Sequence, residues 1–351
     1  MRPALFRRLL VVSVLASMPF FGPVAALQRP AAASGFAETV ARLSEPDGAF
    51  DTDNLISNER AYLHIIPALV SGAVSGGAYI GVGPDQNFSY IARIRPTVAY
   101  IVDIRRDNLL LHLLFKALFA RSTTRIEYLS LLTGRAPPSD LDRWTGSTIA
   151  QIAAYVDRTA PDEDKVAELR QKLDAAMTAF GVPLSRTDLQ TIDRFHRTFI
   201  AGGLGLQFQS FGRAPQFYYP TFRDLVLATD TAGHPWNYLA SEEDFQFVKA
   251  LEERDGLVPV VGNLAGPHAM RAVAEAIAAR GQRVSGFYVS NVENYLYRDG
   301  LFGRFIENVE RLPRDSHSVI IRSIFGGGGS STSVIEPIDA LLTHAPRSRG
   351  R

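Results

Sequence analysis

Residues 78–103, AYIGVGPDQNFSYIARIRPTVAYIVD, contain the pattern from which the fold class follows. The first six residues, 78–83, are apolar or glycine and come after a glycine cluster, which is typical of a buried strand ending in a tight turn. Residues 88–94 have helical spacing and stop before Pro96, and residues 97–103 form a second apolar run. A strand, a helix and a strand within this stretch predict a parallel crossover unit, and so an α/β protein.

The same alternation of strands and helices returns in the last third of the chain. Before it, residues 108–132 read as one long apolar helix, residues 133–200 as a charged helical insertion, and residues 201–240 as an irregular, aromatic-rich segment. We therefore expect one α/β domain over residues 53–325 that carries a helical insertion at about 133–200. The later strands are expected at 257–261, 284–289 and 318–325, and the later helices at 241–254, 267–280 and 303–311.

The first 26 residues have the pattern of a secretory signal peptide. Three arginines precede the apolar run of residues 9–17, and residues 24–26 supply small side chains at the cleavage position. The alternative is a membrane anchor, but Pro23 interrupts the run before it reaches the roughly 20 apolar residues of a spanning helix. We expect an exported protein, periplasmic or secreted, with no stable membrane span after cleavage.

The two ends of the mature chain are expected to be flexible. Residues 27–52 begin with an Ala/Pro/Ser-rich connecting segment and continue into a short amphipathic helix. Residues 326–351 begin with a Gly/Ser-rich run and end with several arginines, which predicts a flexible basic tail. The domain is therefore expected to lie between these two segments.

Charge and composition disfavour several classes of protein. The chain has 37 Lys and Arg against 36 Asp and Glu, and removal of the three arginines of the leader leaves 34 basic against 36 acidic side chains. Nucleic-acid binding usually needs a strongly basic surface, so no nucleic-acid partner is expected. The chain has no cysteine, and its seven histidines do not stand at metal-binding spacing, so no metal is expected. A small molecule is the expected ligand.

Gly81, Gly83 and Asp103 form the candidate ligand site. A glycine turn after a strand lets a ligand approach the backbone, and the N-terminus of the next helix offers N–H groups and a partial positive charge. Asp103 ends the next strand 20 residues after Gly83, an offset at which acids bind ribose hydroxyls in nucleotide-binding crossovers. Two alternatives stay open: glycines needed only for the turn, and a dinucleotide site, although the third glycine of that motif is absent.

At these residues the sequence resembles the class I S-adenosylmethionine-dependent methyltransferases, in particular an exported bacterial branch without a firmly assigned reaction. The resemblance covers roughly residues 60–325 and implies a Rossmann-like, mostly parallel sheet of seven strands. It also implies S-adenosylmethionine at the carboxyl ends of the first two strands, and methyl transfer to an oxygen or nitrogen acceptor. Gly81 and Gly83 match the glycine turn and Asp103 the ribose-binding acid, and Asp85 replaces a small residue beside the cofactor. The competing interpretation is a catalytically silent binding or scaffold protein of the envelope on a degenerate methyltransferase fold.

Polar residues after the later strands are candidates for substrate binding and catalysis. Asn263 follows one strand, and Asn291, Glu293 and Tyr295 follow the next, so the four should lie at one rim of the sheet. Asn263, Asn291 and Tyr295 are candidates for substrate binding and Glu293 for a general base. The alternatives are a helix or turn cap at Asn263 and a hydrogen-bonded loop for the other three.

His268 and Trp236 complete the candidate site. His268 stands at a helix start near Asn263 and is the histidine expected at the cleft, where it would be a second candidate for the base. Trp236 belongs to the aromatic-rich segment and would line an apolar pocket wall or a lid. The alternative for this segment is that its aromatic side chains only anchor it to the core.

Overall fold

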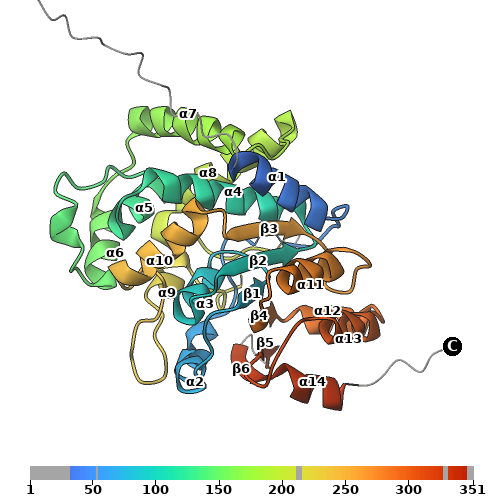
Figure 1. The fold of residues 1–351 in the computed structure, drawn as a ribbon. Coiled ribbons are helices and arrows are strands. Elements are labelled where there is room, and N and C mark those ends of the chain that lie inside the picture. Colours follow the sequence, from blue (N-terminus) through green and yellow to red (C-terminus); the bar gives the residue numbers. More distant parts are fainter. Residues whose placement is uncertain (1–31, 53, 211–215, 327–330, 346–351) are drawn as a thin grey trace, which may run out of the picture.

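The strands form one sheet, and residues expected at the candidate site lie at the edge where its parallel strands end. The computed structural model describes residues 32–52, 54–210, 216–326 and 331–345. Within them the sheet has six strands in the order β3-β2-β1-β4-β5-β6; β1 to β5 are parallel, and β6 pairs antiparallel with β5 at the edge (Figure 1). The bounds are β1 Ala78–Gly81, β2 Val98–Asp103, β3 Leu257–Val261, β4 Val284–Ser290, β5 Val319–Phe325 and β6 Ser331–Pro337.

The central strands are continuous apolar runs because helices cover both faces of the sheet. All residues of β1, β2 and β3 are buried, the pattern expected of a parallel sheet between two helical layers. The first layer contains α3, α4 and α10, the second contains α11 and α13, and α1 lies along the edge strand β3 (Figure 1). These helices are α1 Ala32–Leu43, α3 Gln86–Ile94, α4 Arg106–Arg121, α10 Glu242–Glu253, α11 Ala269–Ala279 and α13 Phe302–Glu310.

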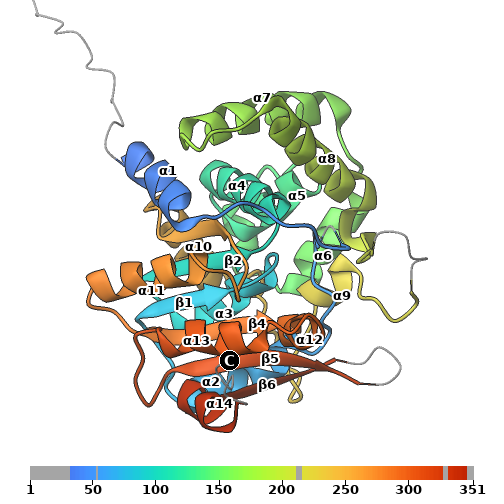
Figure 2. The same ribbon diagram turned by 90° about the vertical axis from the view of Figure 1, so that its right-hand side faces the viewer.

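The helical insertion lies between β2 and β3 and packs on the side of α4 that faces away from the sheet (Figures 1 and 2). Helix α4 is therefore almost wholly buried, with the sheet on one side and the insertion on the other. The insertion and the remaining helices are η1 Tyr62–Ile65, α2 Ile66–Ser71, α5 Arg125–Leu132, η2 Asp142–Trp144, α6 Ile149–Arg158, α7 Glu163–Ala179, α8 Arg186–Gly202, η3 Gly203–Gly205, α9 Phe222–Val226, α12 Val292–Arg298 and α14 Ile338–His344.

The structure confirms the α/β class, the first crossover unit and the helical insertion, and it corrects three expectations. The long helix expected at 108–132 is two helices, because Thr124 caps a new one by accepting a hydrogen bond from Glu127 N–H. The described residues contain six strands, whereas the family resemblance implies seven. The expected flexible tail is wrong for residues 331–344, which form β6 and α14 because β5 offers an edge for pairing and α13 packs against α14.

The expected signal peptide, residues 1–26, lies outside the described residues, as does the start of the connecting segment 27–52. The short helix expected in that segment is α1. In the part of the chain that the structure describes, no helix is both long enough and apolar enough to cross a bilayer.

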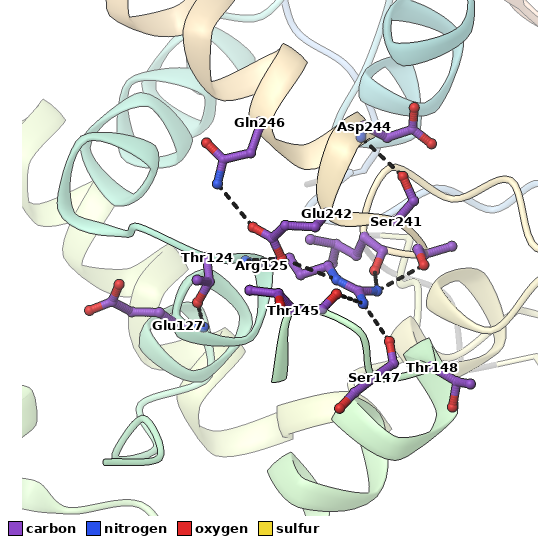
Figure 3. Close-up of polar contacts among 12 residues, drawn as sticks. Thr124, Arg125, Glu127, Thr145, Ser147, Thr148, Ser241, Glu242, Asp244 and Gln246 are labelled. Carbon is purple, nitrogen blue, oxygen red and sulfur yellow. Dashed lines mark hydrogen bonds and ion pairs between the residues drawn. The ribbon is translucent and has the colours of Figure 1, made fainter. Parts of the chain in front are cut away.

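Arg125 fastens the insertion to the α/β body (Figure 3). Its guanidinium is buried and donates to four backbone carbonyls, two in the loop after η2 and two in the loop before α10. The Nε atom lies 3.3 Å from a carboxylate oxygen of Glu242, which neutralises the buried charge. One side chain therefore joins α5, the insertion loop and α10. The four carbonyls are those of Thr145, Ser147, Leu239 and Ala240.

Replacement of Arg125 by methionine should destabilise the fold. Arg125→Met keeps an unbranched apolar stem but removes the donor of four carbonyls and the cation beside Glu242, which we expect to lower the free energy of unfolding by about 3 kcal/mol. Urea denaturation followed by circular dichroism measures this change. Arg121→Met, at an exposed position of α4, is the matched control and should change the free energy by less than about 0.5 kcal/mol. Equal effects of the two substitutions would contradict the role of Arg125 in joining the insertion to the α/β body.

Candidate functional site

A cavity of about 250 Å³ lies at the carboxyl ends of the parallel strands. Four neighbouring strands contribute to it, each by the residues at or just after its end. Ligands of open α/β sheets bind at this edge, where the strand order reverses direction, and here the reversal lies between β1 and β4. The contributions are Val82 and Gly83 after β1, Asp103 and Arg105 at β2, Gly262 and Asn263 after β3, and Ser290 and Asn291 at β4.

The segment between α1 and η1 forms a second wall of the cavity. It leaves α1, crosses the strand ends and contributes residues 49–52, 54, 57 and 58 to the lining (Figure 2). The segment is fixed to the sheet, since Gly48 N–H donates to the carbonyl of Ile104 at 2.8 Å and a carboxylate oxygen of Glu45 accepts from Asn263 N–H at 2.8 Å. The cavity is therefore built from two parts of the chain, the ends of the parallel strands and the segment between α1 and η1.

Five amide and four aromatic side chains are among the residues that line the cavity. Phe50 of the N-terminal segment and Tyr295 of α12 meet edge to face with their ring centroids 4.9 Å apart. Amide side chains can both donate and accept hydrogen bonds, and aromatic rings offer flat apolar surfaces, so the lining suits a small polar ring system. The amide residues are Asn54, Asn58, Gln86, Asn263 and Asn291.

Gly83 is a true turn glycine and lines the cavity, as the sequence predicts. Its φ angle is +80°, which favours glycine, and an added Cβ would lie 3.4 Å from Gln86 Nε2. His112 of α4 places its Nε2 atom 2.9 Å from the Gly83 carbonyl, and burial lowers the pKa of this histidine to about 4. The imidazole is therefore neutral at ordinary pH and donates from Nε2, which holds the turn against α4.

Gly81 does not line the cavity, which corrects the prediction that it belongs to the ligand site. A Cβ on Gly81 would overlap the amide of Asn87 and the ring of Tyr79. The glycine is required because the side chain of Asn87 packs against its backbone. For Gly81, the alternative of a glycine needed by the fold is therefore the correct one.

Asp85 also lies away from the cavity, although its neighbours Pro84 and Gln86 line it. Its carboxyl group is buried, with the Tyr238 hydroxyl 3.5 Å away as a partner. Burial raises the pKa of Asp85 to about 7, and the hydrogen bond from Tyr238 opposes the rise only weakly. The side chain is buried at the start of α3, so Asp85 does not reach the cavity at which the sequence predicts it to lie.

The raised pKa of Asp85 predicts a pH-dependent effect of its replacement by asparagine. Because the folded pKa exceeds the unfolded value, this group's contribution to stability is present at low pH and is lost as the pH rises toward 7. Asp85→Asn should therefore gain about 2 kcal/mol relative to the wild type between pH 5 and pH 8. Urea unfolding at the two pH values measures the gain. Asp142→Asn, at an exposed position, should show the same pH dependence of stability as the wild type. If Asp85→Asn also shows the pH dependence of the wild type, the pKa of Asp85 is not raised.

Asp103 lines the cavity but already has a strong partner. Arg105 Nε donates to one carboxylate oxygen at 3.0 Å and Arg105 Nη2 to the other at 2.9 Å, and the Arg105 backbone N–H adds a third bond. The same guanidinium donates to the carbonyl of Thr52 at 3.0 Å. Each carboxylate oxygen can accept more than one hydrogen bond, so Asp103 can still receive a ligand hydroxyl, but its charge is neutralised by Arg105.

Asn263, Asn291 and Tyr295 line the cavity, as the sequence predicts. The Oδ1 atom of Asn263 also accepts from Ala265 N–H at 2.9 Å, so the turn-capping alternative holds for this residue as well. Tyr295 stands on α12, a helix that sequence reasoning missed because its polar residues read as a loop. Asn263 reaches the rim after β3, whereas Asn291 and Tyr295 reach it after β4, and β2 and β1 lie between these two strands in the sheet.

Glu293, His268 and Trp236 do not line the cavity, so the structure does not bring them to the predicted site. Glu293 lies 3.4 Å from Arg322 of β5, and burial raises its pKa. His268 Nε2 lies 2.8 Å from the carbonyl of Arg42 on α1. Trp236 donates its Nε1–H to Asp230 at 2.8 Å, which supports the anchoring alternative for the aromatic segment. Phe208 and Tyr219 of that segment are the rings that reach the cavity.

Glu59 is a buried acid at the site that sequence reasoning missed. Its side chain is fully buried and accepts hydrogen bonds from Ser290 and Ser323. These partners stand more than 200 residues away in the sequence, so no local pattern around Glu59 could reveal the contact. Among the described residues, no group of three His, Cys, Asp or Glu side chains is arranged to hold a metal ion.

The fold and the cavity define an α/β protein with a cavity at the carboxyl edge of its sheet. The chain belongs to the family described as "Domain of unknown function (DUF7790)", whose family model matches residues 55–201 and 204–340. The matched residues contain all six strands and most of the residues that line the cavity. No curated protein matches the chain.

Proposed function

We propose that this protein binds a nucleoside-type small molecule in the cavity, on a Rossmann-like fold of the methyltransferase type. The observation that carries the proposal is that Gly83 and Asp103, from the ends of β1 and β2, line one cavity at the point where the strand order reverses. The order 3-2-1-4-5 followed by an antiparallel edge strand supports this fold type.

S-adenosylmethionine is the cofactor that the proposal favours, and methyl transfer to an oxygen or nitrogen acceptor is the favoured reaction. The residues suit the nucleoside in part: Asp103 can accept from ribose hydroxyls, and Phe50 and Tyr295 offer ring faces. When bound, the cofactor would supply the activated methyl group, while Asn263 and Asn291 would orient the acceptor. Glu293 and His268 stand outside the cavity, so the proposal gives them no part in the reaction.

A second candidate function is a binding protein of the envelope without catalytic activity. The Arg105 guanidinium favours it, because this group already engages both carboxylate oxygens of Asp103. The structural role of Gly81 favours it too, since one of the two motif glycines then serves packing only. Mass spectrometry of small molecules that co-purify with the protein would identify the ligand in this case.

Isothermal titration calorimetry with S-adenosylmethionine and S-adenosylhomocysteine tests the first candidate. We expect one equivalent of either compound to bind to the purified protein, and Asp103→Asn to weaken binding about tenfold, because the ribose loses a charged acceptor. Asp107→Asn, at a half-exposed position in the first turn of α4 that does not line the cavity, is the matched control and should bind like the wild type. Absence of heat with both compounds and a folded protein would favour the silent binding protein.

We also propose that the protein is exported, on the pattern of residues 1–26. Expressed in a Gram-negative bacterium, it should be recovered from the periplasm or medium as a chain that begins at Leu27, which intact-mass measurement shows directly. Val12→Asp places a charge in the apolar run and should abolish the shortened form. Recovery of a full-length chain from the cytosol of wild-type cells would contradict export.

A further inference from the structure

The carboxyl group of Glu59 is bound by hydroxyl groups, one of which belongs to a residue that lines the cavity. Its side chain is fully buried, and it accepts hydrogen bonds from Ser290 at the end of β4 and from Ser323 of β5. The hydroxyl of Tyr288 also interacts with the carboxyl group, and burial raises the pKa of Glu59. Burial makes a carboxyl group take up a proton more readily, and the hydroxyl donors oppose this effect because they stabilise the carboxylate.

Ser290 connects this buried acid with the cavity. It lines the cavity, and its hydroxyl donates to Glu59. Its φ angle is +53°, a left-handed conformation that is uncommon for a residue with a side chain, and the pairing of β4 with β5 shifts register beside it. A serine on a strained turn between a strand and a helix, above a sheet, is the arrangement in which a hydroxyl is presented to a ligand.

We propose that Ser290 is a nucleophile and that Glu59 is its general base, in a site that acts on small acyl esters. The criterion is a nucleophile and a base within hydrogen-bond reach, with the base oriented by a third group. Ser290 and Glu59 meet the first part, and Ser323, whose hydroxyl donates to the same carboxyl group, meets the second. The proposal goes beyond ligand binding and does not depend on S-adenosylmethionine.

The reaction balances without any further reactant except water. The Oγ atom of Ser290 attacks the acyl carbon, and its proton passes to the Glu59 carboxylate. The ester bond breaks, and the leaving alkoxide takes this proton to become the alcohol. Water then attacks the acyl-serine, gives a proton to Glu59 and releases the carboxylic acid, while Glu59 returns the proton to Ser290. The side-chain amides of Asn58 and Asn291 line the same cavity and carry N–H donors of the kind that stabilise an oxyanion.

Covalent labelling with phenylmethylsulfonyl fluoride tests the proposal on the full chain. We expect mass spectrometry to find the sulfonyl group on Ser290 of the native protein, well above the level in heat-denatured protein. Ser290→Ala should abolish the label, and Glu59→Gln should slow labelling about 100-fold, because the base is lost. Ser316→Ala removes an exposed serine outside the cavity and should be labelled like the wild type.

A second measurement uses 4-nitrophenyl acetate. The wild type should release about one equivalent of 4-nitrophenol in a burst as the acyl-serine accumulates, and Ser290→Ala should show no burst. Circular dichroism establishes that each variant is folded. If Glu59→Gln is not folded, the comparison of Ser290→Ala with Ser316→Ala still decides between the outcomes. A native protein labelled no faster than the denatured one, or a label or burst that persists in Ser290→Ala, overturns the proposal. Neither outcome bears on the calorimetric test of nucleoside binding.

Discussion

The conformation of the turn that lines the cavity after β1 depends on one buried amide side chain. Asn87, in the first turn of α3, donates from Nδ2 to the carbonyls of Val82 and Pro84, each at 2.8 Å, and its Oδ1 accepts from the Tyr79 hydroxyl at 2.8 Å. Both the oxygen and the nitrogen of its amide therefore have hydrogen-bond partners, and a buried polar group without them would destabilise the fold. By binding the carbonyls of the turn, Asn87 determines which side of the turn faces the cavity. The end of β1, the start of α3 and the position of Gly83 all follow from this contact.

Much of the fold could be predicted from the sequence because its signals are local. The strands at 98–103, 257–261 and 284–290 are continuous apolar runs, and each was expected within a residue or two of its observed bounds. Ser241 accepts from Asp244 N–H at 3.0 Å, so the helix start expected there is also correct. Strand β6 was missed because its sequence, STSVIEP, is polar and becomes a strand only through pairing with β5.

The site could be predicted only as far as topology determines it. Residues that follow parallel strands must meet at one edge, which is why Gly83, Asp103, Asn263 and Asn291 were correctly expected together. Orientation and partners depend on tertiary contacts, and these separate Gly81 from Gly83 and turn Asp85 into the core. For the same reason, the pairs Arg105–Asp103 and Ser290–Glu59 could not be read from spacing. Glu59 in particular lies in a segment whose sequence has no recognisable motif.

The segment between α1 and η1 has a mechanical consequence. Glu45 and Gly48 form hydrogen bonds with residues at the strand ends, and the residues that follow form a wall of the cavity, so this segment connects α1 directly to the cavity. Helix α1 begins at Ala32, only a few residues after the expected cleavage position. A protein fused directly ahead of α1 would therefore be joined, through α1, to the segment that forms this wall of the cavity.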